Sequence, residues 1–134
     1  MRFMMMVKSS ETTGQPPREL MEAIGKMVEA DAKEGKIVAS GGLAPTVASS
    51  RVRVSGGKLV ILDGPFTETK EVVGGYAVME FASKQEALES AVRFMELHKK
   101  FWPEWEGETE LRQIFGADDY TTESGRVQRK SDFK

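Results

Sequence analysis

The stretch Arg2-Phe3-Met4-Met5-Met6-Val7-Lys8 decides the fold of this chain. Successive side chains of a β-strand point to opposite faces of the sheet. Phe3 and Met5 therefore share one face of such a strand, whereas Met4 and Met6 share the other. A strand that is apolar on both faces suits the middle of a sheet that is covered on both sides. The sequence thus predicts a central strand.

The segments around this strand alternate between strand and helix patterns. Helices are predicted over 18–34 and 84–101, because apolar residues recur there at helical spacing, and Ser83-Lys84-Gln85-Glu86 forms a capping box before the second. The other predicted strands are 37–43, a hairpin of 51–54 and 58–62, 71–81 and 108–115. This order is a split βαβ pattern of the ferredoxin-like kind. We expect an α+β domain over 1–116 and a polar C-terminal tail over 117–134.

Composition excludes several classes of protein. The 134 residues suit a single domain, and the net charge of −2 gives no basic footprint for nucleic acid. The chain has no cysteine and one histidine, which excludes disulfides, thiolate chemistry and a multi-histidine metal site within one subunit. No apolar run approaches the roughly 18 residues of a membrane-spanning helix, and the N-terminus lacks a signal-peptide pattern. We expect a cytoplasmic protein with neither a nucleic-acid nor a membrane partner.

The second face of the predicted sheet needs a cover. The strand over 71–81 carries Ala77 and Met79 on one face and Tyr76 and Val78 on the other. Such a two-sided apolar sheet does not stay open to water over a large area. A second copy in a two-fold homodimer is the favoured cover, and the hairpin or the tail folding back is the alternative.

The loop from Asp63 to Glu71 is the densest cluster of turn-forming and charged residues. Asp63 can accept hydrogen bonds from the backbone of the turn. Glu68 and Lys70 would share one side of an extended segment, so that together with Phe66 they could bind a polar or anionic ligand. The alternative is a rigid turn whose charges discourage edge-to-edge aggregation.

His98 is the only imidazole of the chain. It follows Ala91 by seven positions, which places the two within about 20° around a helix. His98 is therefore expected on the packed stripe of the second helix, near Met95 and Trp102. A histidine with a near-neutral pKa can act as a general acid or base. It can equally be a hydrogen-bonded core residue.

Two further pairs are candidate ligand-binding residues. Trp102 and Trp105 either wall a pocket or plug the gap between the helix end and the sheet. Arg51 and Arg53 share one strand face, where they could bind a carboxylate or phosphate or simply be solvated. The paired glycines of the chain lack the spacing of a dinucleotide-binding motif, and no cofactor or metal is predicted.

Several blocks of the sequence carry a family resemblance that runs from Met1 to about Tyr120. They include Asp63-Gly64-Pro65-Phe66 with the following Thr67-Glu68-Thr69-Lys70-Glu71, then Gly74-Gly75-Tyr76, and a later block of His98, Trp102-Pro103 and Trp105-Glu106-Gly107-Glu108. With these blocks the chain resembles the YCII-related, DGPF-domain family. The later block is similar to one branch of that family.

The resemblance implies a ferredoxin-like domain that forms a dimeric α/β barrel, with the DGPF loop near a cleft between helices and sheet. It does not imply an established reaction. Some members have been proposed to be enzymes through a His–Asp pair whose histidine lies near the first strand. This chain has no histidine there, so Asp63 matches the motif's aspartate without that partner. Other members are fused to, or neighbours of, sigma factors.

Two functions are compatible with these features. The first is binding of a small polar molecule in the cleft, with or without cofactor-free catalysis. His98 is then the acid/base candidate, and Asp63, the second catalytic candidate, would orient the polar end of the ligand with Glu68 and Lys70. The second is a non-catalytic regulatory or accessory module linked to transcription systems. A cavity shared by His98 and the DGPF loop would favour the first function, and a His98 sealed in packing would favour the second.

Overall fold

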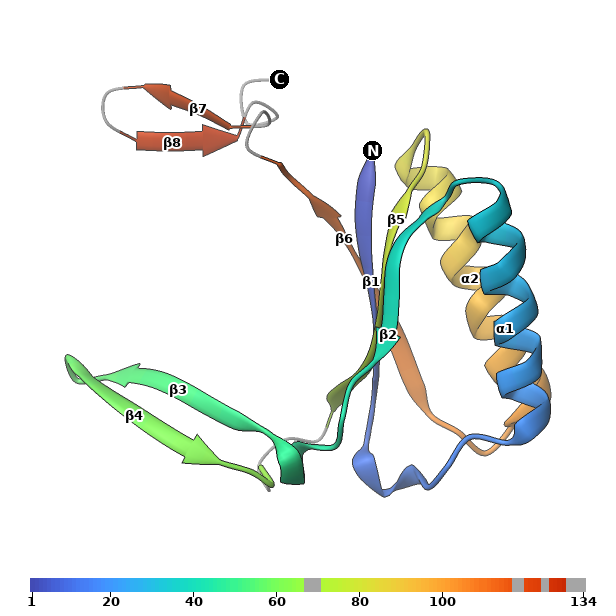
Figure 1. The fold of residues 1–134 in the computed structure, drawn as a ribbon, viewed down its shortest axis with the longest axis horizontal. Coiled ribbons are helices and arrows are strands. Elements are labelled where there is room, and N and C mark those ends of the chain that lie inside the picture. The colour runs from blue at the N-terminus through green and yellow to red at the C-terminus, as the bar shows by residue number, and fades with distance from the viewer. Residues whose placement is uncertain (67–70, 117–119, 124–125, 130–134) are drawn as a thin grey trace.

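A computed structural model describes residues 1–66, 71–116, 120–123 and 126–129. An antiparallel sheet of four strands carries two α-helices on one of its faces (Figure 1). The elements in chain order are β1 (Arg2–Ser9), the 3-10 turn η1 (Glu11–Thr13), α1 (Arg18–Lys33), β2 (Ile37–Gly42), the 3-10 turn η2 (Thr46–Ala48), β3 (Ser50–Ser55), β4 (Lys58–Asp63), β5 (Val72–Glu80), α2 (Lys84–Phe101), β6 (Gly107–Ile114), β7 (Tyr120–Glu123) and β8 (Arg126–Arg129).

The sheet has the strand order β2-β5-β1-β6, with β1 in its interior as the sequence predicted. Met5 of β1 pairs with Ala77 of β5 on one side and with Leu111 of β6 on the other. The α+β class and the predicted order of the main strands and helices are confirmed. Within the described part of the chain the sheet does not close into a barrel, because β2 and β6 remain free edges.

The core lies between the sheet and α2. Phe3, Met5 and Met79 of the sheet pack there with Ala87 and Ala91 of the helix. The predicted capping box is present in a modified form. Ser83 Oγ accepts a hydrogen bond from the Glu86 N–H (3.2 Å), but the Glu86 carboxylate accepts from the N–H of Ala82 instead of that of Ser83.

The two helices are anchored unequally. In α1 only Leu20 is fully buried, whereas α2 buries Ala87, Ser90, Ala91 and His98. The remaining apolar residues of α1 are half-buried or exposed, although they form a clear stripe along the helix. The stripe therefore does not fill the space beneath α1.

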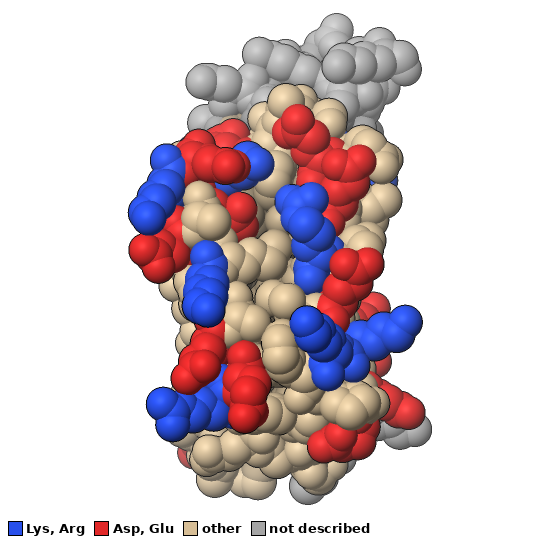
Figure 2. Space-filling model, turned by 90° about the vertical axis from the view of Figure 1, so that its right-hand side faces the viewer, with Lys and Arg blue, Asp and Glu red and all other residues tan. Residues whose placement is uncertain are grey.

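The outer surface of the helices carries charges of both signs. Figure 2 shows acidic and basic side chains interspersed over this face. Some of them form ion pairs one helical turn apart, such as Arg18 with Glu22 and Lys33 with Glu29. Such exposed pairs contribute little to stability. No helix among the described residues is both long and apolar enough to span a membrane.

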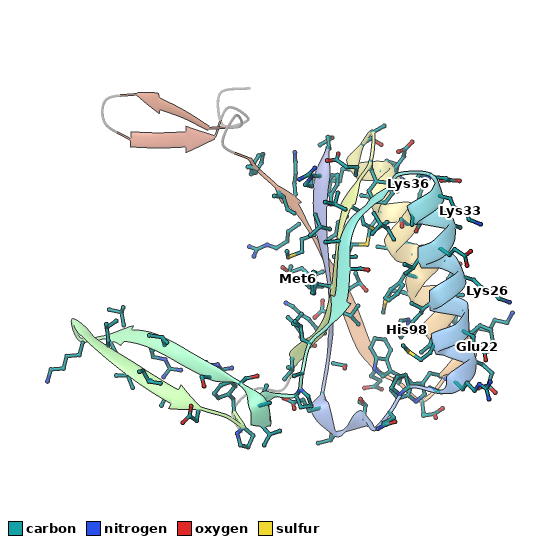
Figure 3. All side chains as sticks on the ribbon, in the orientation of Figure 1. Met6, Glu22, Lys26, Lys33, Lys36 and His98 are labelled. Carbon is teal, nitrogen blue, oxygen red and sulfur yellow. The ribbon has the colours of Figure 1, made fainter. Side chains whose placement is uncertain are left out.

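The sheet face opposite the helices is only partly covered within one chain. Met6 lies on this face, directed away from the helices (Figure 3), and it stays half-buried, as do Met4 and Tyr76. Ion pairs flank the apolar side chains, including Lys8 with Glu110 (2.6 Å). Neither of the two chain-internal covers that the sequence left open is seen among the described residues.

The hairpin of β3 and β4 projects from this open-face side of the sheet as an arm (Figure 1). Val52 pairs with Ile61 and Val54 with Leu59, so that these four side chains share one face of the arm. Each is more than 70% exposed. The arm therefore presents an apolar face that nothing in the described chain covers.

The C-terminal segment differs from its prediction. The sequence predicted only a polar tail after residue 116, whereas β7 and β8 pair as an antiparallel hairpin. The polar composition of this segment hid the hairpin, because no apolar alternation marks its strands.

Candidate functional site: a cavity beneath the first helix

A cavity of about 640 Å³ lies between the helices and the sheet. Its apolar wall comes from Leu20, Ile24 and Met27 of α1 and from Met5 and Met79 of the sheet. Protein interiors are normally close-packed, with few voids larger than a water molecule. A space of this size matches the volumes of small-molecule sites and is far larger than a packing defect.

His98, which Figure 3 labels, belongs to α2, lines this cavity and is 6% exposed. Its Nδ1 lies 3.0 Å from the carbonyl oxygen of Phe94. A carbonyl oxygen can only accept, so Nδ1 carries the hydrogen and donates it. Burial lowers the pKa of His98, although the hydrogen bond to Phe94 opposes this shift. The ring is therefore neutral at neutral pH, and its Nε2 is a hydrogen-bond acceptor.

The free Nε2 of His98 opens onto the cavity. It has no hydrogen-bond partner among the described residues. No side-chain nitrogen or oxygen in that part of the chain is both fully buried and unpartnered. Nε2 must therefore retain contact with solvent, and the cavity that His98 lines provides that contact.

Ser90 is a second polar group on the same stripe of α2. It precedes Phe94 by one helical turn and His98 by two, it is 1% exposed, and it also lines the cavity. No hydrogen bond of its Oγ is seen among the described residues, and none of their side-chain oxygens is both fully buried and unpartnered, so this hydroxyl, like Nε2, keeps contact with the solvent of the cavity. Eight residues of helix separate Ser90 and His98 by about 12 Å along the axis.

Aromatic rings surround the imidazole. The centroid of the His98 ring lies 4.8 Å from that of Phe94 and 4.6 Å from that of Trp105. Trp102 stacks on Trp105 with centroids 6.1 Å apart, and both indoles line the cavity. Gly107 makes room for this arrangement, because a Cβ there would lie 2.2 Å from the Trp105 ring and 2.6 Å from the Lys8 carbonyl oxygen.

Two carboxylates line the cavity, and no lysine or arginine does so among the described residues. The Glu11 carboxylate accepts from the Thr46 N–H, at 3.3 and 3.2 Å from its two oxygens. Burial raises the pKa of Asp31, an effect that the charges of Lys36 and Arg93 oppose. Those two cations act on Asp31 from outside the cavity lining.

The DGPF residues form a turn at the base of the arm. Asp63 accepts a hydrogen bond from Ser50 Oγ (2.8 Å), and the Arg51 guanidinium lies 3.7 Å from the centre of the Phe66 ring. Gly64 packs against the backbone of Thr46 so closely that a Cβ would lie 1.6 Å from its carbonyl oxygen. These local contacts give Asp63, Gly64 and Phe66 of the DGPF motif a structural role in the turn.

The structure places the residues predicted for the site in two different regions of the molecule. Trp102, Trp105 and His98 line the cavity, but Asp63, Phe66, Arg51 and Arg53 are not among its lining residues. Glu68 and Lys70 lie outside the described residues. The described part of one chain thus does not assemble the DGPF loop and His98 around one cavity.

Comparison with known proteins supports the family resemblance that the DGPF motif at the base of the arm carries. Residues 1–95 match the family model of the YCII-related domain. The chain belongs to the YCII-related domain family. A segment of 83 residues is 39% identical to an uncharacterized protein of Rhizobium meliloti (strain 1021), covering 62% of this chain and 64% of that protein. The aligned region thus spans just under two thirds of the relative's length.

The matched YCII-related region ends three residues before His98, so the block of His98 and the two tryptophans lies beyond it. Sequence reasoning also missed four cavity residues on which the site depends: Ser90, Phe94, Asp31 and Glu11. A signal for the first two was present, because positions 90, 94, 98 and 102 recur every four residues and share one face of a helix. Helical stripes were interpreted as core, and nothing in their spacing shows whether the space beneath them is filled.

Proposed function

We propose that this YCII-related domain binds a small molecule in the cavity beneath α1, with His98 as the side chain that contacts its polar group. The observation that carries the proposal is the buried imidazole with an unpartnered Nε2 on the cavity wall. Nε2 keeps contact with the solvent of the cavity, so it is an accessible hydrogen-bond acceptor on a largely apolar and aromatic wall. A few well-placed polar groups on an apolar wall are what fixes the orientation of a ligand in a small-molecule site.

The chemistry that suits this site is proton transfer without a cofactor. The neutral imidazole can take a proton from a hydroxyl or an acidic C–H of the ligand at Nε2 and later return it. The Phe94 carbonyl holds the ring in the orientation and tautomer that this requires. The flanking rings of Phe94 and Trp105 contact the imidazole ring, and this apolar contact favours its neutral form.

Crystallography of the protein incubated with a cell metabolite extract tests this proposal. We expect density in the cavity within hydrogen-bond distance of His98 Nε2. His98→Asn is the matched variant, because an asparagine amide can still donate to the Phe94 carbonyl but lacks Nε2. It should lose the bound density while its melting temperature stays nearly unchanged. Loss of about 1–3 kcal/mol of stability without any effect on binding would identify a purely structural histidine.

We also propose that the protein is a homodimer of ferredoxin-like domains whose open sheet faces meet, as in a dimeric α/β barrel. Two surfaces support this proposal: the half-buried methionines of the open face and the apolar face of the arm. A two-stranded hairpin is marginally stable alone in water. Its six-residue strands are about 20 Å long, and stacked sheets lie about 10 Å apart, so the arm is long enough to pass the interface and pack on a partner.

Analytical ultracentrifugation tests the dimer. We expect a species of twice the chain mass at micromolar concentration. A single 14.9 kDa species under those conditions would contradict the proposal.

A further inference from the structure

We infer that the cavity takes an uncharged hydrogen-bond donor with an apolar ring body, such as a phenol, and that it rejects carboxylates and phosphates. This inference rests on the proposed function, because it assumes that the cavity binds a ligand. It names the chemical class of that ligand from three features of the wall.

The first feature is the hydrogen-bonding character of His98. Nδ1 donates to the Phe94 carbonyl, which leaves Nε2 of the neutral ring with a lone pair and no hydrogen. A ligand must therefore offer a hydrogen to Nε2. A hydroxyl group does so, whereas an ionised carboxylate or the dianion of a phosphate monoester presents only acceptors.

The second feature is the charge of the lining. Glu11 and Asp31 are its ionisable acids, and no cationic side chain lines it among the described residues. An anion entering this space would lose hydration without gaining a counter-charge, and it would meet two carboxylates. An uncharged ligand avoids both costs.

The third feature is the apolar and aromatic wall between the polar groups. Phe94, Trp102 and Trp105 lie along the His98 end of the cavity, where flat rings can stack. Ser90 lies about 12 Å further along α2, so a ligand that reaches both groups has an apolar body between two polar ends. The cavity volume of about 640 Å³ accommodates a two-ring compound.

Three probes of the same size test this inference: 2-naphthol, naphthalene and 2-naphthoate. Binding to the full-length protein is measured at neutral pH by isothermal calorimetry, and amide chemical shifts map the site. We expect 2-naphthol to bind about tenfold tighter than naphthalene, which is the value of one hydrogen bond of roughly 1.4 kcal/mol. We expect 2-naphthoate to bind more weakly than either.

Two variants make the test specific. His98→Asn should lower the affinity for 2-naphthol to that for naphthalene and leave naphthalene binding unchanged. Asp31→Asn should raise the affinity for 2-naphthoate. Glu22→Gln, an exposed carboxylate change on α1 outside the cavity lining, should not do so.

The outcomes separate the two proposals. Tightest binding by 2-naphthoate, mapped to the cavity, would overturn the ligand class and leave the proposed binding site intact. Equal binding of naphthol and naphthalene in the cavity would also overturn the class, because Nε2 would then make no hydrogen bond to the ligand. Failure of all three probes to shift cavity amides would overturn the binding site itself, and the inference with it.

Discussion

Replacement of Ser90 by alanine should stabilise the protein. The Ser90 side chain is 1% exposed and lines the cavity, and no hydrogen bond of its hydroxyl is seen among the described residues. No side-chain oxygen of the described residues is both fully buried and unpartnered, so the hydroxyl meets the solvent of the cavity and is only partly desolvated. Ser90→Ala removes this partial cost, which is smaller than the roughly 1–3 kcal/mol of a fully buried, unpartnered hydroxyl. Alanine also has the higher helix propensity, by a few tenths of a kcal/mol. The void that alanine leaves is small, because the hydroxyl already borders a cavity.

The expected net gain is about 0.5–1 kcal/mol, or roughly 2–4 °C in melting temperature for a domain of this size. Urea unfolding followed by far-UV circular dichroism measures the free energy, and calorimetry measures the midpoint. The same variant should bind a cavity ligand that spans α2 less tightly. Stability that rises while affinity falls would identify Ser90 as a residue kept for binding.

Ala87→Ser provides the matched control. Ala87 is fully buried on the same helix, in the apolar core. Introducing a hydroxyl there should lower the stability by about 1–3 kcal/mol. Our reasoning would be refuted if Ser90→Ala lost about 1 kcal/mol or more, since the hydroxyl would then be making an intramolecular hydrogen bond.

Three further predictions concern other parts of the molecule. Burial lowers the folded-state pKa of His98 from its ordinary 6.5, so its contribution to the free energy of unfolding is complete above that pH and declines as the pH falls below it. His98→Asn should therefore flatten the acid side of the profile of unfolding free energy against pH. An unchanged profile would argue against a buried neutral imidazole. Gly64→Ala should cost about 1–3 kcal/mol because its Cβ would overlap the Thr46 carbonyl, whereas Gly25→Ala, which meets nothing within 4 Å in α1, should gain about 0.5–1 kcal/mol in the same melting assay. Ile61→Asp, on the exposed face of the arm, should shift the sedimentation coefficient from dimer to monomer without unfolding the sheet, and a dimer of unchanged affinity would remove the arm from the interface.

The sequence predicted the order of the main strands and helices, because the local signals agreed with one another. The doubly apolar segment of β1, the capping box before α2 and the Gly56-Gly57 turn each predicted an element that the structure contains. Each signal reports a local property: strand alternation, a helix start or a positive φ. The hairpin of β7 and β8 lacks such a signal in its polar sequence and was missed.

The candidate site was predictable only in part, because a cavity is a property of packing and not of sequence pattern. The spacing of His98 after Ala91 correctly placed the imidazole on the inner stripe of α2. The same spacing gave no sign that α1 stands off from the sheet, and therefore Ser90 was not recognised. The conspicuous charges of the DGPF loop drew attention to a turn that the Thr46 backbone and Arg51 account for locally.

The unequal anchoring of the helices has a consequence for how a ligand reaches the cavity. Leu20 alone fixes α1 deeply, whereas α2 is part of the core. Regions with few buried apolar contacts open at lower free energy than the core does. Backbone amides of α1 should therefore exchange with deuterium by sub-global opening, while those of α2 exchange only when the whole domain unfolds. The proposed ligand would then enter and leave the cavity through the opening of α1, while the sheet and His98 keep their places.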